Sequence, residues 1–227
     1  FLEIGTQDYK ESNTRFLLVN KNWDGFLIEA DKNEVKKIKS QRIFWRHNLK
    51  IANEFITKDN INDVIKKFNV PKKLGLLSLD IDGVDYWVLN ELSVLDPSII
   101  ICEYNSIFGI NKSITVPYKK NFIRSKEHYS NLYYGASIQA FINVMKIKNY
   151  HLLGTNSAGN NAFFIKRNLW RKASMLITEK KIFESKFRES RNINGNLTFL
   201  DKKKSLKLIK NKLMIDLKNN KKKKFLN

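Results

Sequence analysis

The sequence predicts an α/β protein with three layers, in which helices cover both faces of a mostly parallel sheet. Three observations predict this fold. Short apolar runs alternate with stretches whose apolar residues have helical spacing. The central run, Leu74 to Leu79, is apolar enough for a strand that is buried on both faces of a parallel sheet. The last two runs, 150–153 and 162–165, are joined by a loop rich in Gly, Asn and Ser, which predicts a closing hairpin.

The elements of the first part of the chain follow from local signals. A short apolar strand over 1–5 ends in an acid and a glycine, and a helix begins near Arg15. A second strand is expected at 26–29, after a turn marked by Trp and Gly. Asp31 is placed to cap a helix over 32–40, because Asp accepts hydrogen bonds from the first helical turn.

The later elements are predicted in the same way. A third strand lies near the end of 44–56, and the apolar spacing in 60–68 and in 135–147 predicts two more helices. A fifth strand covers 98–102. The long polar and aromatic segment 108–131 is interpreted as a loop that covers an active site.

Three carboxylates follow the central strand within six residues: Asp80, Asp82 and Asp85. Gly83 allows a sharp turn among them, and a helix follows. Asp82 or Asp85 can serve simply as the cap of that helix. Three acids at one strand end repel one another more than capping requires. Because open α/β sheets bind ligands at the C-terminal ends of their strands, we expect a functional role for this cluster.

The first and second strands carry a signal for a nucleoside. Gly5 ends the first strand and is followed by a polar loop whose backbone N–H groups can approach a ligand. Glu29 closes the second strand, where an acid can accept both ribose hydroxyls of a nucleoside cofactor. Each signal alone is weak, since the loop is no G-x-G-x-x-G and Glu29 can also be an acid at a helix start.

Two further groups are candidates for chemistry. In a sheet of order 3-2-1-4-5, strands four and five lie beside strand one, so Glu103 and Asn105 would share a pocket with Asp80 and Asp82. His128, in a polar loop before a helix, is a candidate general base, although a lone His is usually structural.

Several motifs resemble one known family. The stretches F-L-E-I-G-T-Q-D-Y, W-x-G-F-L-I-E and L-L-S-L-D-I-D-G-x-D-Y-W resemble a bacterial branch of the class I S-adenosylmethionine-dependent methyltransferases. The segment Asp80 to Asp85 is similar to the D-x-E-G-x-E motif of the FkbM-type family. I-C-E-Y-N, H-Y-S-N-L-Y-Y-G-A-S and G-T-N-S-x-G-x-N-A-F-F extend the resemblance over residues 1–168, and R-E-S-R-x-x-N-G-N-L carries it past Arg188.

The resemblance implies a Rossmann-like sheet of order 3-2-1-4-5-7-6 with an antiparallel last strand, and methyl transfer from S-adenosylmethionine. An acceptor on a sugar or surface-polysaccharide precursor is expected. The resemblance assigns the methionine part of the cofactor to the loop after the first strand and the ribose to Glu29. The residues expected to bind the cofactor are Glu3, Gly5, Thr6, Gln7, Asp8, Asn13, Glu29 and Asp80. Those expected in catalysis are His128, Asp82 and Glu103, and those expected to touch the acceptor are Asn105, Tyr129 and Asn156.

Two other functions stay open. Asp80-Ile81-Asp82 is a D-x-D, which a metal-dependent glycosyltransferase uses to hold Mg²⁺ or Mn²⁺ against a nucleotide sugar. Asp80, Asp82 and Glu103 could also ligate a metal that assists a methyltransferase. The third possibility is a non-catalytic module of methyltransferase-like fold that binds other molecules.

Charge divides the chain. Of the net charge of +20, residues 165–227 hold 20 Lys and Arg against 5 Asp and Glu, a net +15. We therefore expect a methyltransferase-like domain over 1–168 and a basic helical extension over 169–227 with a disordered Lys-rich end. The basic tail indicates a polyanion or membrane-surface partner, unless it reflects the codon bias of an AT-rich genome. No specific nucleic acid is expected.

The remaining composition bounds the setting. Cys102 lies in an apolar run and is expected to be a small buried hydrophobe rather than a ligand or a disulfide. With one cysteine, no signal peptide and no apolar run of about 18 residues, a cytoplasmic protein is expected. Because the chain begins at Phe1 inside a strand pattern, its natural N-terminus is expected to lie further upstream.

Overall fold

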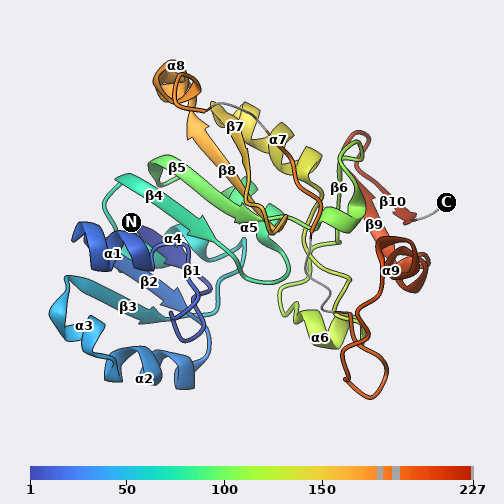
Figure 1. The fold of residues 1–227 in the computed structure, drawn as a ribbon, viewed down its shortest axis with the longest axis horizontal. Helices are drawn as coiled ribbons and strands as arrows, with labels where there is room; N and C mark the ends of the chain where they lie inside the picture. Colours follow the sequence, from blue (N-terminus) through green and yellow to red (C-terminus); the bar gives the residue numbers. More distant parts are fainter. Residues whose placement is uncertain (178–180, 186–189, 226–227) are drawn as a thin grey trace. The chain divides into compact units, whose positions relative to one another are not determined.

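The computed structural model describes residues 1–177, 181–185 and 190–225 (Figure 1). Contacts group the chain into two units. Unit 1 comprises Phe1–Ile81 and Val88–Cys102, and unit 2 comprises Asp82–Trp87 and Glu103–Asn227. The boundary at residue 168 stays a prediction of the sequence. Arg188, at the far end of the family resemblance, lies outside the described residues.

The main sheet confirms the predicted fold class. In the described part of the chain it has seven strands in the order β3-β2-β1-β4-β5-β8-β7. Counted along this sheet alone, that order is the expected 3-2-1-4-5-7-6. The strands are β1 (Leu2–Ile4), β2 (Gly25–Glu29), β3 (Leu49–Asn53), β4 (Lys73–Leu79), β5 (Asp96–Glu103), β7 (Tyr150–Thr155) and β8 (Asn161–Lys166). The protein is therefore a Rossmann-like α/β fold with a methyltransferase strand order.

Unit 1 holds the parallel core of the sheet. β1 pairs with β2 and β4 on its two sides, and the side chains of Leu2, Leu27 and Leu77 are fully buried. Such runs, apolar on both faces, are typical of parallel strands covered by helices. The helices of this part are α1 (Arg15–Lys21), α2 (Lys32–Ser40), α3 (Arg42–Arg46) and α4 (Ile61–Lys67).

Local signals placed several of these elements correctly. The carboxylate of Asp31 accepts the backbone N–H of Asn33 at 2.6 Å, which confirms the predicted cap of α2. The third strand falls at β3, within the predicted window. α5 (Asp85–Glu91) begins in unit 2 and continues into unit 1. Asp85 accepts the N–H of Gly83 at 2.9 Å and thereby stabilises the turn before this helix.

Unit 2 contains the predicted hairpin, in which β7 and β8 pair antiparallel. α7 (Ile138–Ile147) starts three residues later than predicted, because Ser137 caps it and Gly135 before it has a left-handed backbone. Its buried side chains include Ile138, Phe141 and Met145, as its spacing predicts. The other short elements are η1 (Ser106–Phe108), β6 (Ile114–Thr115), α6 (Arg124–Glu127), η2 (Arg167–Leu169) and α8 (Trp170–Ser174).

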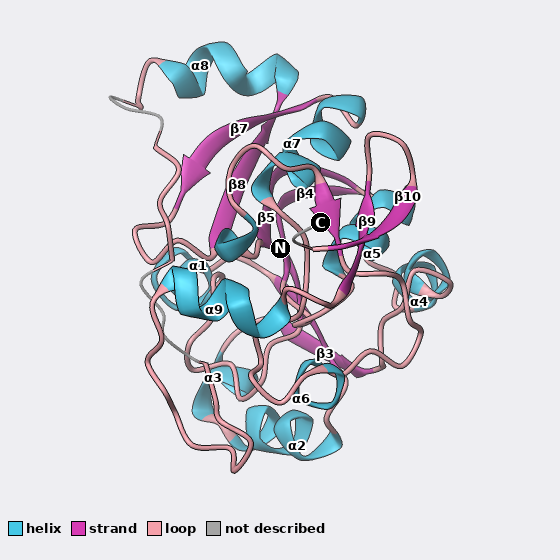
Figure 2. Cartoon of the chain, turned by 90° about the vertical axis from the view of Figure 1, so that its right-hand side faces the viewer, coloured by secondary structure: helices cyan, strands magenta, loops and turns pink. Residues whose placement is uncertain are grey.

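The secondary structure of the tail differs from the prediction. α9 (Lys202–Ile209) is shorter than the predicted helix, and β9 (Leu213–Asp216) and β10 (Lys221–Lys224) follow it as a hairpin (Figure 2). The lysine run is thus a strand rather than a disordered end. In the described residues β9 also pairs with β6, which makes a second sheet of three strands. Residues 226 and 227 lie outside the described part.

The hairpin has an identifiable cause. Asn220 adopts a left-handed backbone, which Asn tolerates better than most residues, and Asn219 accepts the N–H of Lys221. Phe225 after β10 is buried, with its ring 5.3 Å from that of Phe108. None of the described helices has both the length and the apolarity that crossing a bilayer requires.

Candidate functional site

The turn after β1 has an unusual backbone. Gly5, Gln7 and Tyr9 all have positive φ angles, of 80°, 47° and 61°. A methyl group at Gly5 would overlap the carbonyl oxygen of Asp80, so only glycine fits where this turn passes the end of β4. The N–H of Gly5 is bonded to the carbonyl oxygen of Ile28 at 2.9 Å, which holds the turn against β2.

Glu29 closes this turn at the end of β2. One oxygen of its buried carboxylate accepts the backbone N–H groups of Thr6 and Gln7, at 2.9 and 2.8 Å. The other accepts the N–H of Asp31 at 2.8 Å. The structure therefore brings Glu29 together with the loop, as the sequence predicts, but the loop N–H groups point at Glu29 itself. An ionised carboxylate has about four lone-pair positions, so about one remains for a further donor.

Glu3 is buried at the centre of a second network. Its carboxylate accepts the hydroxyl of Ser12 at 2.8 Å, the backbone N–H of Asn13 at 3.1 Å and the hydroxyl of Thr14. Burial raises the pKa of Glu3, and the hydrogen bonds from Thr14 and Ser12 counteract part of that rise. In this arrangement Glu3 fastens the 12–14 segment to β1.

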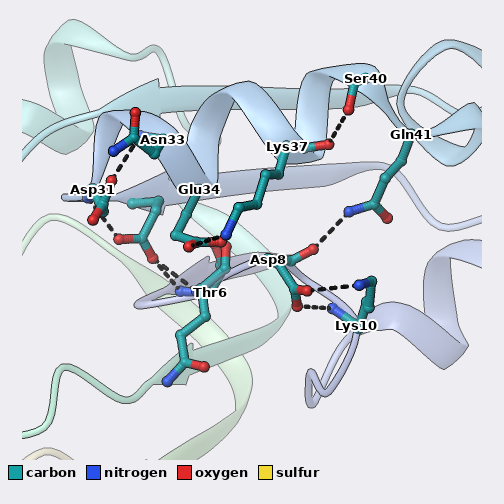
Figure 3. A network of polar contacts seen from close by, with 11 residues as sticks. Thr6, Asp8, Lys10, Asp31, Asn33, Glu34, Lys37, Ser40 and Gln41 are labelled. Atoms are coloured by element: carbon teal, nitrogen blue, oxygen red, sulfur yellow. Dashed lines mark hydrogen bonds and ion pairs between the residues drawn. The ribbon is translucent and has the colours of Figure 1, made fainter.

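The other residues expected at the cofactor lie around these two acids. Asp8 forms an ion pair with Lys10 at 3.1 Å, and its backbone carbonyl accepts the side chain of Gln41 at 2.7 Å (Figure 3). Asn13 donates to the hydroxyl of Ser78 at 3.0 Å. The N–H of Asp80 is bonded to the carbonyl oxygen of Ile4 at 3.0 Å, which continues the β1–β4 pairing. Unit 1 thus gathers the whole predicted set at the C-terminal ends of β1, β2 and β4.

In unit 2, two of the acids that the sequence singled out, Asp82 and Glu103, lie near Arg124. Asp82 has a φ of 56°, rare for a residue other than glycine, and its carboxylate is 2.5 Å from the guanidinium of Arg124. The same guanidinium lies 3.7 Å from the centre of the Tyr134 ring. Burial opposes the charge of Arg124, but Tyr134, Asp82 and Glu103 together raise its pKa above the ordinary value.

A metal does not suit this group well. Carboxylate oxygens of Asp82 and Glu103 lie within 4.8 Å of each other, a separation that a divalent ion can bridge. Arg124 already supplies the positive charge beside both. An ion bound to these two carboxylates would lie near a permanently charged guanidinium and be repelled by it; a metal at Asp80, Asp82 and Glu103 stays a prediction.

Glu103 and Arg124 also line a pocket of about 270 Å³ that lies wholly in unit 2. The described segments 184–185 and 190–205 contribute one wall, which carries three serine hydroxyls and the charged side chains of Glu184, Asp201 and Lys202. The pocket therefore combines hydroxyls, carboxylates and an aromatic ring. Its other lining residues are Asn105, Ser106, Ile107, Leu132, Tyr134, Asn160, Ser185, Ser190, Leu200 and Ser205.

Asn105 lines the pocket, but its amide is used by the backbone. Its Nδ2 donates to the carbonyl oxygens of Leu132 and Tyr134, each at 3.0 Å, and its Oδ1 accepts the N–H of Ile107 at 3.3 Å. A buried amide with these partners holds the pocket wall in place. The structure therefore gives Asn105 a supporting role; direct contact with an acceptor stays a prediction.

His128 and Tyr129 stack on each other with ring centres 4.5 Å apart, and neither is among the residues that line the pocket. Nδ1 of His128 accepts the backbone N–H of Ser130 at 3.3 Å and shares a 2.6 Å hydrogen bond with its hydroxyl. Burial lowers the pKa of His128, and Lys212 lowers it further. A neutral imidazole that accepts hydrogen bonds at Nδ1 carries its proton on Nε2. Neither ring nitrogen of His128 then has a free lone pair for the proton of an acceptor, which disfavours a role as general base.

Asn156 stabilises the turn between β7 and β8. Its Oδ1 accepts the backbone N–H groups of Gly159, Asn160 and Asn161, at 3.0 to 3.1 Å. Through these bonds Asn156 has a structural role in this turn.

The sequence did not single out Arg124, Tyr134 or the pocket wall from segments 184–185 and 190–205. An arginine in a long polar segment has no local pattern that marks it, and its partner Asp82 is 42 residues away. Only the family-like segment near Arg188 pointed to this part of the chain.

No protein-family model matches this sequence, and no curated protein matches it. Solved structures to which it is similar include a putative caffeoyl-CoA O-methyltransferase from Staphylococcus aureus, with 15% identity, a TM-score of 0.46 and coverage of 73% of this chain and 74% of that one. The methyltransferase domain of bacterial CtHen1-C has 10% identity, a TM-score of 0.45 and coverages of 73% and 88%. The glycopeptide N-methyltransferase MtfA, complexed with (S)-adenosyl-L-homocysteine, has 7% identity, a TM-score of 0.41 and coverages of 73% and 81%.

These neighbours are described as methyltransferases, one of them as putative. At identities of 7% to 15% the likeness concerns the fold alone, and the FkbM-type branch stays a prediction.

Proposed function

We propose that this chain is an S-adenosylmethionine-dependent methyltransferase that methylates an oxygen of a sugar or a surface-polysaccharide precursor. The observation that carries the proposal is the turn after β1, where Gly5 and the buried carboxylate of Glu29 meet at the C-terminal ends of adjacent strands. In a sheet of this strand order, that edge is where a nucleoside-containing cofactor is expected.

The residues of unit 1 can hold such a cofactor, but they leave fewer free hydrogen-bond positions than the two ribose hydroxyls would use. Gly5 leaves the turn without a side chain, and Glu29 keeps about one lone-pair position for a ribose hydroxyl rather than positions for two. S-adenosylmethionine, when bound, supplies an electrophilic methyl group. Glu29 has a double role in this proposal, since it shapes the loop and accepts one hydroxyl.

The unit 2 pocket supports a polyhydroxylated acceptor. Sugars are recognised by side chains that both donate and accept hydrogen bonds, and the pocket offers serine hydroxyls, carboxylates and the Tyr134 ring. Glu103 is the candidate base, because its buried carboxylate lines the pocket and His128 does not. Glu103 would accept the acceptor's hydroxyl proton as the acceptor oxygen takes the methyl group, whose bond to the sulfur of S-adenosylmethionine would break, and Arg124 lies nearby to stabilise the charge of the acids.

Calorimetric titration of the full-length protein with S-adenosylmethionine tests this function. Glu29→Gln should weaken binding by roughly ten- to a hundredfold, because it removes a charged acceptor. Glu54→Gln is the matched control, since Glu54 pairs only with the exposed Lys67 in the described residues. Glu103→Gln should lower turnover and leave cofactor affinity within about threefold.

Two results would refute the proposal. If millimolar S-adenosylmethionine gives no heat and no rise in melting temperature, the chain does not bind the cofactor. If a nucleotide sugar with manganese raises the melting temperature instead, the D-x-D of Asp80 and Asp82 holds a metal, and the protein is a glycosyltransferase.

A further inference from the structure

The loop 190–200, which leads into α9, has a fixed backbone. Ser190 is buried, and its carbonyl and hydroxyl oxygens accept the N–H groups of Thr198 and Leu200, at 2.8 and 3.1 Å. Within the loop, Asn192 accepts the N–H groups of Asn194 and Asn196, each at 3.0 Å. The Ser190 bonds join the two ends of the loop and the Asn192 bonds stabilise the turn within it, so the loop's own hydrogen bonds determine its shape.

This loop presents large apolar side chains to solvent. Ile193 is 82% exposed, Phe199 61% and Leu197 46%. Phe199 also has a φ of 49°, a conformation that is unfavourable for a bulky residue. The Ser190 hydrogen bonds on both sides of Phe199 hold it there and leave its ring in solvent. Apolar groups fixed outward in this way are typical of a surface that another phase or molecule covers.

Positive charge adjoins the apolar loop. α9 begins three residues after Phe199 and carries exposed lysines at 203 and 207, and the exposed Lys210 caps its C-terminal end. None of these lysines forms an ion pair within the parts of the chain that the structure describes. The apolar side of α9 is already used, since Ile209 is buried. The helix therefore contributes charge to this surface, and the loop contributes the apolar side chains.

We propose that the loop 190–200 and the lysines of α9 form a docking surface for an anionic lipid bilayer. Ile193, Leu197 and Phe199 enter the region between headgroups and acyl chains, and the lysines contact anionic headgroups. A polyanion would contact the lysines but would leave the three apolar side chains exposed to water. A second copy of the chain would bring the lysines of two α9 helices together, and like charges repel. This inference is independent of methyl transfer.

Sedimentation with lipid vesicles tests the surface. Vesicles of phosphatidylcholine alone are compared with vesicles that also contain phosphatidylserine. Ile193→Asn with Phe199→Asn removes the apolar groups, and Asn keeps the left-handed backbone at 199. We expect this variant to bind the anionic vesicles roughly tenfold or more weakly than the wild type. Ile147→Asn is the control, because Ile147 is 81% exposed at the end of α7.

The charge contribution has its own pair of variants. Replacing Lys203, Lys207 and Lys210 with Gln should weaken binding to anionic vesicles by roughly fivefold for each lysine, and added salt should weaken the wild type similarly. The control replaces three exposed lysines of α2 with Gln, those at 32, 36 and 39. It should change binding by less than about twofold.

Several outcomes would overturn the proposal. One is a wild-type protein that sediments equally with both kinds of vesicle, or with neither. If the Ile193 and Phe199 variant binds vesicles as the wild type does, while the lysine variant no longer binds heparin, the surface binds polyanions. If light scattering shows a wild-type dimer that the Ile193 and Phe199 variant converts to a monomer, the loop is an interface between copies. Far-UV circular dichroism of each variant confirms that it is folded.

Discussion

Two glycines in this structure share a backbone conformation and differ in the space beside them. Gly5 has a φ of 80° and Gly109 a φ of 79°. A Cβ at Gly5 would overlap the backbone oxygen of Asp80, whereas nothing lies within 4 Å of a Cβ at Gly109. Gly109→Ala thus measures the conformational cost alone, roughly 1–2 kcal/mol.

Gly5→Ala should therefore reduce the free energy of unfolding by about 3 kcal/mol or more, because the overlap with a fixed backbone adds to the same conformational cost. Denaturant titration of both variants measures the difference. Equal losses for the two alanine variants would mean that the turn after β1 relaxes away from Asp80.

Glu3 gives the folded protein a pH dependence of known sign. Burial raises its pKa in the folded state above the ordinary value of 4.5. Its contribution to stability is therefore fully present below pH 4.5 and is lost as the pH rises through the folded pKa. The free energy of unfolding of the wild type, relative to Glu3→Gln, should fall over that interval and then level off. A difference that stays constant with pH would contradict the burial of this carboxylate.

How far the site could be predicted depends on the distance between interacting residues along the chain. The cap by Asp31 needs only its neighbour Asn33, and the proximity of Glu29 to the turn after β1 follows from two adjacent strands. The contacts of Arg124 with Asp82 and Tyr134 bring together three separate segments, and no local pattern indicates them. The hydrogen bonds that occupy Glu29 likewise depend on loop geometry.

At the scale of elements, periodicity predicted the strands and most helices, because each buries one apolar face. In the tail, α9 confirms the first part of the predicted helix, but its continuation and the disordered Lys-rich end were predicted wrongly. The apolar residues fit a helix loosely, and the turn at Asn219 and Asn220 makes a hairpin instead. The structure joins this hairpin to the long segment between β5 and α7: Tyr133 donates to the carbonyl oxygen of Leu213 at 2.6 Å, and Lys212 to that of Glu127 at 2.6 Å.

Phe225 anchors the end of this hairpin, so its truncation tests the role of the tail. Phe225→Ala should lower the free energy of unfolding by roughly 3 kcal/mol, since the ring is 3% exposed and packs on Phe108. Phe16→Ala is the control, because the Phe16 ring is 60% exposed and its loss should cost less than about 0.5 kcal/mol. Equal stability of the two variants in denaturant would mean that the tail is a dispensable appendage.

At the scale of the whole molecule, the two units are interleaved along the chain. Unit 2 contains the short segment Asp82–Trp87, which is separated in sequence from its remaining residues. Three interactions come from this segment. Asp82 forms the ion pair with Arg124, and the carbonyl oxygen of Gly83 accepts the N–H of Gly135 at 2.8 Å. The indole N–H of Trp87 donates to the carbonyl oxygen of Val116 at 2.9 Å. All three interactions fix the region between residues 116 and 135, which includes part of the pocket wall.

A fragment of residues 103–227 should therefore fail to fold stably, although it holds most of unit 2. Without residues 82–87 the fragment loses the Asp82 carboxylate beside Arg124 and the hydrogen bonds of Gly83 and Trp87. Because Asp82 is about half exposed, these losses together cost on the order of 3 kcal/mol, which is still a large part of the stability of a domain this size. Near-UV circular dichroism and thermal melting of the fragment measure this. A sharp cooperative melt, with native-like near-UV signals from the tyrosines of 129–134, would show that the segment 82–87 is not needed and that unit 2 is an independent domain.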